Sequence, residues 1–521
     1  MIQREKLISQ LENTKDWDVI IIGGGASGLG IAVDAASRGF KTVLFEKYDF
    51  AKGTSSKSTK LLHGGVRYLA QGDVKLVIEA LEERGRLKKN AKHLFKKQEF
   101  IIPNYRWWKG PYYLIGLKLY DWLSKRLSLG ASKFVGKKKV RAALPTLKTE
   151  HLANGVSYFD GQFDDARLAL NLAQTALEQG ALAINYMNVT SFEKGQDHLI
   201  QSVLVEDVET QKRYSVKGKA IINATGIFTD SILKKFNPNH KKMVVPSQGI
   251  HLMVDGSFLQ SKKAIMIPKT SDGRVLFIIP WHDKVIAGTT DTLIKKPKIE
   301  PTPLHEEVDF ILETMNQYLE KKATREDVLS VFSGLRPLAK PKKEETSTKE
   351  VSRSHKIIVD ENLISIIGGK WTTYRKMAED VVDEVIRSFQ FEKVPVKTTK
   401  LSIHGNISEK MSAPDHEYFY GSDLSDFKKL EASNPAFQKK IHPKYPYTNA
   451  QVVWSVRNEM ARTVEDFLSR RIRLLLLDAK AAKEAAPQVA RLIAQELKRD
   501  KEWETQQIEA FQKLSEKYIL Q

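Results

Sequence analysis

Three glycines, Gly23, Gly25 and Gly28, stand in the spacing Gly-x-Gly-x-x-Gly directly after a short apolar run. In such a turn the first glycine permits the tight bend and the second lets the backbone approach a pyrophosphate. The third allows a helix to pack closely on a strand, and the start of that helix offers amides and a positive dipole to phosphate oxygens. Glu46, eighteen residues beyond Gly28, is placed to accept hydrogen bonds from a ribose. A glycine turn without a ligand is the plainer alternative, but the pattern as a whole predicts a dinucleotide site.

Two further residues have side chains suited to the oxidation of an alcohol. His251 lies in the run 249–254, whose apolar residues alternate onto one face and leave the histidine on the other. A histidine can accept a hydroxyl proton near neutral pH, although a histidine packed in a core is the common case. Arg336 is too basic to accept a proton, so we expect its guanidinium to stabilise a developing oxyanion.

The elements around the glycines form a strand–helix–strand unit. Residues 17–22 read as a strand, 26–38 as a helix that Gly39 ends, and 42–45 as a second strand. A later apolar strand at 221–223 ends in Ala-Thr-Gly, which resembles the segment that returns the chain to the flavin in two-dinucleotide-binding-domain flavoproteins. Only one glycine fingerprint in the sequence follows a strand, so there is no sign of a separate NAD-binding domain. We therefore favour bound FAD that the substrate reduces directly.

The rest of the sequence divides into regions of different residue composition and pattern. Short β-branched runs between 246 and 291 predict antiparallel strands, 339–349 is a basic, proline-containing loop, and the chain becomes helical from 394. We therefore predict an α/β protein with a Rossmann-like FAD-binding domain, a mostly antiparallel β substrate domain and a C-terminal α-helical domain. The FAD-binding domain takes 1–80, 150–240 and 355–393, the substrate domain 81–149 and 241–354, and the helical domain 394–521.

Composition limits the classes of function. The 521 residues carry a formal net charge of +20, which favours anionic partners such as a phosphorylated substrate, a membrane surface or nucleic acid. The absence of cysteine excludes disulfides, thiolate metal sites and cysteine nucleophiles. The polar N-terminus shows no targeting segment, and the apolar stretch 19–33 holds five glycines, so we expect neither a signal nor a membrane span.

Five segments together resemble the FAD-dependent, aerobic-type glycerol-3-phosphate dehydrogenases. They are Thr54–Tyr68, Gly288–Asp291, Ser333–Leu338, Gly368–Arg375 and Glu465–Arg473, in addition to the glycine motif. The resemblance implies an overall fold similar to the D-amino acid oxidases and noncovalently bound FAD. It further implies oxidation of sn-glycerol 3-phosphate to dihydroxyacetone phosphate, transfer of electrons to membrane quinone, and peripheral attachment at the inner, cytoplasmic face of the cytoplasmic membrane.

The resemblance assigns roles to individual residues. It favours His251 as the base with Arg336 beside the reacting hydroxyl, and it expects no metal. A phosphate needs several cations, and the candidates are Arg67, Arg336, Arg353 and Lys370, with Tyr68 as a neutral donor. For Lys370 a solvated lysine in a helix-capping loop is the alternative. The residues assigned to FAD are Gly23, Gly25, Ser27, Gly28, Glu46, Thr54, Ser55, Thr59, Lys60, His63, Val189, Ala224, Thr225, Gly226, Gly368, Gly369, Lys370 and Thr372.

Several partners and alternatives stay open. Residues 105–122 interleave aromatic, aliphatic and basic residues, which suits either a membrane interface or packing against the substrate domain. Oxygen instead of quinone as acceptor would make the protein an oxidase that releases peroxide. A basic RNA-binding flavoprotein is a remote alternative, but no RNA-recognition motif is evident and we expect no nucleic-acid partner. A homodimer is one candidate for the oligomeric state.

Overall fold

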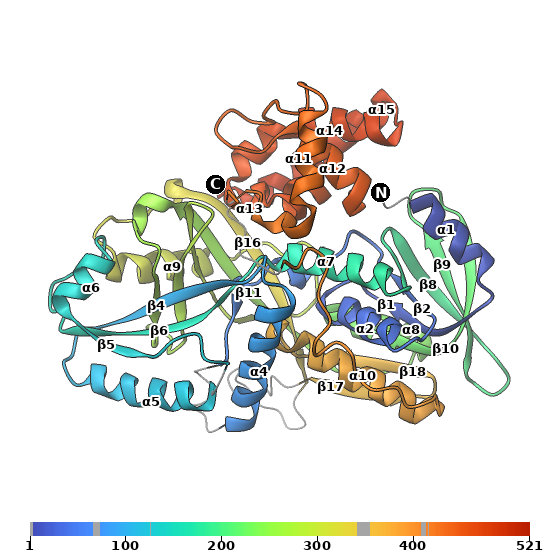
Figure 1. Cartoon of the computed structure of the whole chain (residues 1–521), viewed down its shortest axis with the longest axis horizontal. Coiled ribbons are helices and arrows are strands. Elements are labelled where there is room, and N and C mark those ends of the chain that lie inside the picture. Colours follow the sequence, from blue (N-terminus) through green and yellow to red (C-terminus); the bar gives the residue numbers. More distant parts are fainter. Residues whose placement is uncertain are drawn as a thin grey trace.

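The computed structural model describes residues 4–65, 73–124, 127–340, 355–407, 413–414 and 416–520, in which two sheets stand side by side below a helical C-terminal domain (Figure 1). The first sheet has the order β17-β18-β10-β1-β2-β7, and a hairpin formed by β8 and β9 extends it from β10. Its strands are β1 (Asp16–Ile22), β2 (Thr42–Phe45), β7 (Leu182–Ile184), β8 (Met187–Lys194), β9 (Ile200–Asp207), β10 (Arg213–Asn223), β17 (Lys356–Asp360) and β18 (Leu363–Ile367).

The centre of this sheet is parallel and buried on both faces. β1 pairs in parallel with both β10 and β2, and residues 19–21 are fully buried. Continuous apolar strands are typical of parallel sheets that helices cover on both sides. The covering and flanking helices are α1 (Arg4–Asn13), α2 (Ala26–Ser37), α7 (Asp165–Glu178), α8 (Thr229–Phe236) and α10 (Tyr374–Phe389).

Local sequence signals start two of the long helices. The Asp73 side chain accepts a hydrogen bond from the Leu76 amide at 3.1 Å at the start of α4 (Val74–Asn90). Asp164 caps α7 in the same way, accepting from the Arg167 amide at 3.0 Å. Such caps satisfy amides that have no partner within the helix, so each aspartate fixes the start of its helix.

The second sheet is almost entirely antiparallel, with one parallel pair between β12 and β4. β6, which the sequence places with the FAD-binding segments 150–240, instead pairs along its whole length with β4 in this sheet. Its strands are β3 (Leu61–Leu62), β4 (Lys96–Asn104), β5 (Lys133–Gly136), β6 (Asn154–Gln162), β11 (Val244–Asp255), β12 (Ala264–Ile267), β13 (Leu276–Trp281), β14 (Lys284–Gly288), β15 (Thr292–Leu293) and β16 (Val328–Ala339). Its helices are α4, α5 (Lys109–Ser124), α6 (Lys137–Ala143) and α9 (His305–Tyr318).

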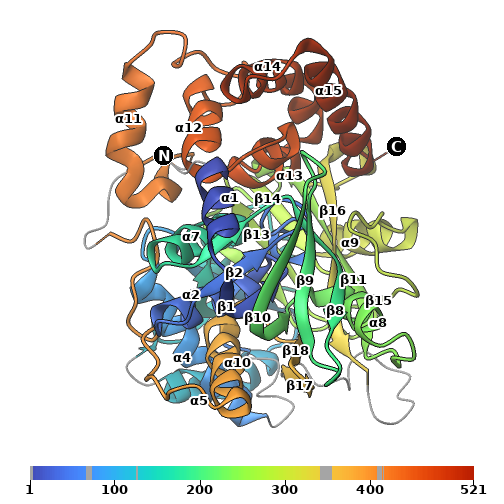
Figure 2. The ribbon, with the colours of Figure 1, turned by 90° about the vertical axis from the view of Figure 1, so that its right-hand side faces the viewer.

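The C-terminal domain lies over the junction of the two sheets, as the orthogonal view in Figure 2 also shows. Its helices are α11 (Leu424–Ala432), α12 (Asn449–Glu459), the π-helical turn η8 (Asp466–Arg471), α13 (Leu474–Leu477), α14 (Ala479–Leu497) and α15 (Lys501–Ser515). The leucines 474–477 share one apolar core with Trp281 and Phe332 of the second sheet. Burial therefore joins this domain to the second sheet rather than leaving it as an appendage.

His404 fastens the segment that leads into the C-terminal domain. Its Nε2 lies 2.8 Å from Asp423, and its Nδ1 lies 2.5 Å from Glu178 on α7. The two carboxylates, outweighing partial burial, raise the pKa of His404 to about 9, so the ring is charged at neutral pH. In the part of the chain that the structure describes, no helix has the length and apolar character needed to cross a membrane.

Candidate active site

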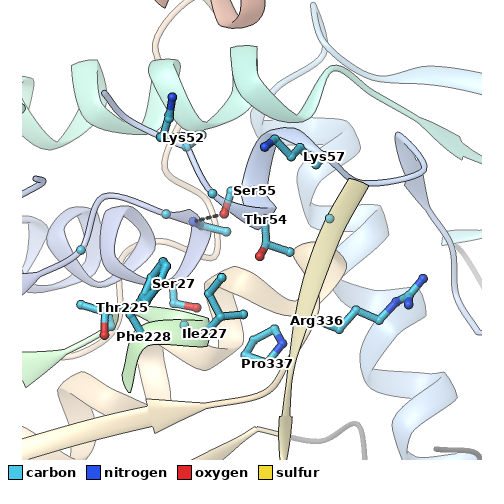
Figure 3. A pocket seen from close by; sticks show the side chains of 18 of the residues that line it. Ser27, Lys52, Thr54, Ser55, Lys57, Thr225, Ile227, Phe228, Arg336 and Pro337 are labelled. Atoms are coloured by element: carbon cyan, nitrogen blue, oxygen red, sulfur yellow. Dashed lines mark hydrogen bonds between the residues drawn. The ribbon is translucent and has the colours of Figure 1, made fainter. Parts of the chain in front are cut away.

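A cavity of about 600 Å³ lies between the two sheets. Its lining residues come from the ends of β1, β2, β10 and β18 in the first sheet and from β11 and β16 in the second. Figure 3 shows the cavity from close by. The sequence-predicted residues that line it are Gly23, Gly25, Ser27, Glu46, Thr54, Ser55, Thr59, His63, Val189, Ala224, Thr225, Gly226, His251, Arg336, Gly368, Gly369, Lys370 and Thr372. Arg67, Tyr68 and Arg353 lie outside the described residues.

The glycine turn forms a close backbone cradle at one wall. A Cβ on Gly23, whose φ is +108°, would lie 2.8 Å from the Ala224 carbonyl oxygen, and a Cβ on Gly25 would lie 3.0 Å from Ser55 Oγ. The Ala26 amide donates to the same Ser55 hydroxyl at 2.9 Å. Gly28 does not line the cavity, because it packs on the turn itself, where a Cβ would lie 1.8 Å from the Gly23 carbonyl. The cradle fits the pyrophosphate of a dinucleotide.

Glu46 stands at the end of β2 beside this cradle. One carboxylate oxygen accepts from the Gly24 amide at 2.6 Å and the other from the Tyr48 amide at 2.8 Å. Burial raises the pKa of Glu46, an effect that these two amides oppose. The two hydrogen bonds from these amides fix the carboxylate in place at the cavity wall. Val189 from β8 also lines the cavity.

His251 lies on β11 and lines the same cavity. Its ring is 2% exposed, stacks on Phe332 with centroids 4.9 Å apart, and holds Nε2 2.9 Å from Thr59 Oγ1. Burial, followed by the positive charges of Lys60 and Arg336, lowers the pKa of His251 well below its usual value. The imidazole is therefore neutral at physiological pH and able to accept a proton.

Arg336 reaches the cavity from β16, the strand that pairs with β11. Its guanidinium donates to Thr289 Oγ1 and to the Thr290 carbonyl, both at 3.1 Å, and to Asp291 Oδ1 at 3.4 Å. Gly249 makes room for it, since a Cβ there would lie 2.3 Å from a guanidinium nitrogen. In Figure 3 the Arg336 side chain lies on the other side of β16 from Ser27 and Thr225.

A second glycine turn follows β18, and its residues Gly368 and Gly369 line the cavity. Gly368 and Gly369 have φ values of +81° and +88°, which favour glycine. Lys370 then caps the short helix η6 (Trp371–Thr373), and the Trp371 indole donates to the Ser55 carbonyl at 2.9 Å. This contact ties the turn to the loop 54–60 that carries Thr59.

The structure does not bring Lys60 to the cavity. Its ammonium is fully buried and donates to Asp165 at 2.7 Å, so the side chain points into the protein instead. Conversely, sequence reasoning missed cations that do line the cavity: Lys47, Lys52, Lys57 and Lys235. Lys57 lies inside the segment Thr54–Tyr68 and Lys52 lies two residues before it, but their partners Glu300 and Glu465 are distant in sequence and gave no local signal.

The donor set and shape of the cavity fit FAD. The volume lies within the usual range for cofactor sites. The glycine cradle and the start of α2 fit the pyrophosphate, and Glu46 fits the adenosine ribose.

Comparison with known proteins places the chain. The family described as FAD dependent oxidoreductase matches residues 18–368, and the C-terminal domain of alpha-glycerophosphate oxidase matches 363–504. The mitochondrial glycerol-3-phosphate dehydrogenase of Schizosaccharomyces pombe is 38% identical over 558 residues, covering 95% of this chain and 86% of the relative. The human mitochondrial enzyme is 37% identical over 544 residues, covering 98% and 74%.

Two solved structures agree with this placement. The glycerol-3-phosphate dehydrogenase from Bacillus halodurans complexed with FAD has a TM-score of 0.80 at 29% identity, covering 99% of this chain and 98% of that one. L-alpha-glycerophosphate oxidase from Mycoplasma pneumoniae with FAD bound has a TM-score of 0.56 at 18% identity, covering 74% and 97%, and supports the fold. The sequence prediction of fold and family is confirmed: this chain belongs to the FAD-dependent oxidoreductases and, within them, to the glycerol-3-phosphate dehydrogenase family.

Proposed function

We propose that this protein oxidises sn-glycerol 3-phosphate to dihydroxyacetone phosphate with bound FAD and passes the electrons to a membrane quinone. The observation that carries the proposal is that a neutral, buried His251 and Arg336 line the same cavity, whose donor set fits FAD. When bound, FAD supplies the acceptor for the hydride that leaves the carbinol carbon. The family assignment and the names of the relatives support the substrate.

The chain's own residues supply the proton and charge chemistry. His251 is placed to take the hydroxyl proton, and the Thr59 hydroxyl, 2.9 Å from Nε2, holds the ring in orientation. Arg336 lies on the neighbouring strand, and its charge stabilises the alkoxide character that develops as the proton leaves. Lys370, which also lines this cavity, is our candidate for the substrate phosphate. Arg67, Tyr68 and Arg353 remain predictions for that role.

The acceptor is tested by comparing products. Glycerol 3-phosphate and a short-chain quinone are expected to yield equal amounts of dihydroxyacetone phosphate and quinol, with little peroxide under air. Stoichiometric peroxide, with quinone giving no faster turnover than oxygen, would identify an oxidase instead. Absence of dihydroxyacetone phosphate with either acceptor would refute the proposed substrate.

The membrane partner is proposed to bind at one face of α5. Trp108, Tyr112, Ile115, Leu119 and Trp122 follow one another at intervals of three or four residues and are all exposed, from 46% to 73%. The opposite face packs inward, with Leu117, Tyr120 and Leu123 buried. The helix lies along an outer edge of the molecule (Figure 1).

The charge around this face suits an anionic lipid surface. Arg106, Lys109 and Lys118 lie on or beside α5, and Trp107 before the helix is 75% exposed. Aromatic and basic side chains together are typical of helices that lie in the interface of a bilayer. We therefore propose peripheral attachment through α5, at the inner, cytoplasmic face of the cytoplasmic membrane. The sequence left two roles open for residues 105–122, a membrane interface and packing against the substrate domain. We assign the first role to the exposed face of α5 and the second to its buried face.

A further inference from the structure

A buried cluster of four charged side chains lies behind the loop 54–60. Lys60 comes from the loop, Asp164 and Asp165 from the start of α7, and Arg473 from the C-terminal domain, and each is at most 1% exposed. Asp165 accepts from the Lys60 ammonium at 2.7 Å through one oxygen and from the Arg473 guanidinium at 2.8 Å through the other. None of the four lines the cavity, so the mechanism above does not use them.

The cluster holds the backbone of the loop. Lys60 Nζ and an Arg473 guanidinium nitrogen both donate to the Ser56 carbonyl, each at 2.7 Å. Asp165 also accepts from the Ser58 amide at 3.0 Å and from the Ser58 hydroxyl at 2.7 Å. Lys60 itself has a φ of +63°, a conformation that a residue other than glycine adopts only where its surroundings enforce it. The residues on both sides of Thr59 are thus fixed.

A second route leads from Lys60 to His251 through an aromatic ring. The Lys60 ammonium lies 5.2 Å from the centroid of Phe332, and the same ring stacks on His251. The charged groups that act on the imidazole are Lys60 and Arg336, and Arg336 is itself paired with Asp291. Burial, reinforced by Arg473, lowers the pKa of Lys60 to about 7, while Asp165 opposes that shift. The charge next to His251 is therefore set by the cluster.

We propose that Lys60, Asp165 and Arg473 are positioning residues for His251, so that the C-terminal helical domain completes the active site through Arg473. They act by fixing the Thr59 hydroxyl against Nε2 and by placing a positive charge behind Phe332. The inference rests on the proposed function, in which His251 accepts the substrate proton.

The first test removes the ammonium and retains most of the side chain. In Lys60→Met we expect flavin reduction by glycerol 3-phosphate to be about tenfold slower at pH 7, because Thr59 and His251 lose their alignment. Loss of the positive charge also raises the pKa of His251. Since only the neutral ring accepts a proton, the acidic limb of the rate profile shifts upward by about one pH unit. Lys60→Arg, which keeps the charge, is expected to restore the acidic limb.

The control uses another buried ion pair between the same helix and the same domain. Arg167 on α7 donates to Glu459 at 2.7 Å, and both side chains are 2% exposed. Arg167→Met and Arg473→Met both remove a buried cation at this junction, so both are expected to lower the melting temperature. Only Arg473→Met is expected to slow flavin reduction and to change its pH profile. Equal kinetic effects from both variants would show a merely structural role and overturn the inference.

A second variant and an NMR titration of His251 provide further tests. If Lys60→Met yields no folded protein, Ser58→Ala carries the test, because it removes one donor to Asp165 without removing a charge; unchanged flavin reduction there would refute the loop route. An NMR titration of ¹³C-labelled histidine follows His251 without turnover, its signal being identified by loss in His251→Asn. A parent protein that glycerol 3-phosphate does not reduce refutes the proposed function, whereas an unmoved His251 titration in Lys60→Met refutes this inference alone.

Discussion

Arg336 is the residue whose replacement tests the substrate end of the cavity most sharply. Its guanidinium donates hydrogen bonds to Thr289 Oγ1, to the Thr290 and Gln248 carbonyls and to Asp291, and its side chain is 26% exposed. Truncating a desolvated charge that stabilises a partner costs roughly 2 to 5 kcal/mol. Because a quarter of this side chain remains exposed, we expect the lower part of that range, about 2 to 3 kcal/mol, in Arg336→Ala.

This loss corresponds to a fall of about 30- to 150-fold in kcat/KM. The assay is anaerobic stopped-flow reduction of the flavin over a range of glycerol 3-phosphate concentrations. An oxyanion role predicts that the limiting rate falls while the apparent affinity changes little; a loss confined to affinity would assign Arg336 to the phosphate instead. Arg336→Lys keeps the charge but loses the planar fork, so its rate of flavin reduction is expected to lie between those of the parent and of Arg336→Ala.

Arg325 provides the matched control for this prediction. Its side chain is 29% exposed and donates to Asp309 at 2.6 Å, but it does not line the cavity. Arg325→Ala is expected to keep the parent rate of flavin reduction. A rate for Arg336→Ala within threefold of the parent would refute the assignment.

Three further predictions follow from the site, the C-terminal segment and α5. His251→Asn is expected to slow flavin reduction by about 100-fold with FAD still bound; unchanged reduction kinetics would remove the histidine from the mechanism. The raised pKa of His404 contributes stability that is complete below about pH 6.5 and lost as the pH rises through about 9, so His404→Gln is expected to lose about 2–3 kcal/mol at pH 6 and little at pH 10 in urea unfolding; a pH-independent loss would contradict this. Replacing Trp107, Trp108 and Lys109 together is expected to weaken salt-sensitive binding to anionic liposomes; binding equal to the parent's would assign the interface to another surface.

The liposome experiment has its own control in an exposed apolar side chain elsewhere. Leu293 is 50% exposed on β15, away from α5. Leu293→Ser removes such a side chain and is expected to leave liposome binding unchanged. A similar loss in both variants would indicate general surface hydrophobicity rather than a docking face.

The features that the sequence predicted well are those set by local patterns. The strand–helix–strand unit around Gly23 and Gly25 could be predicted because a parallel βαβ unit needs an apolar strand, a glycine turn and a helix within a short span. The position of His251 on the strand face opposite its apolar neighbours followed from the period of a β-strand.

What the sequence did not reveal depends on contacts between distant segments. Lys60 belongs to a segment that the sequence predicts to contact the cofactor, yet its partners Asp165 and Arg473 lie far along the chain and turn its ammonium into the interior. The strand β6 pairs with β4 in the second sheet, and strand pairing has no local signature that distinguishes one sheet from another. For the aromatic segment 105–122, the two faces became distinguishable only when burial was known.

Anaerobic absorbance of the purified protein tests the central claim most directly. Added sn-glycerol 3-phosphate is expected to bleach the visible flavin band rapidly, unphosphorylated glycerol is expected to leave it unchanged, and quinone is expected to restore it. A yellow protein that does not bleach would contradict the assigned substrate and leave the fold intact. A protein that stays colourless after addition of FAD would contradict the cofactor assignment itself.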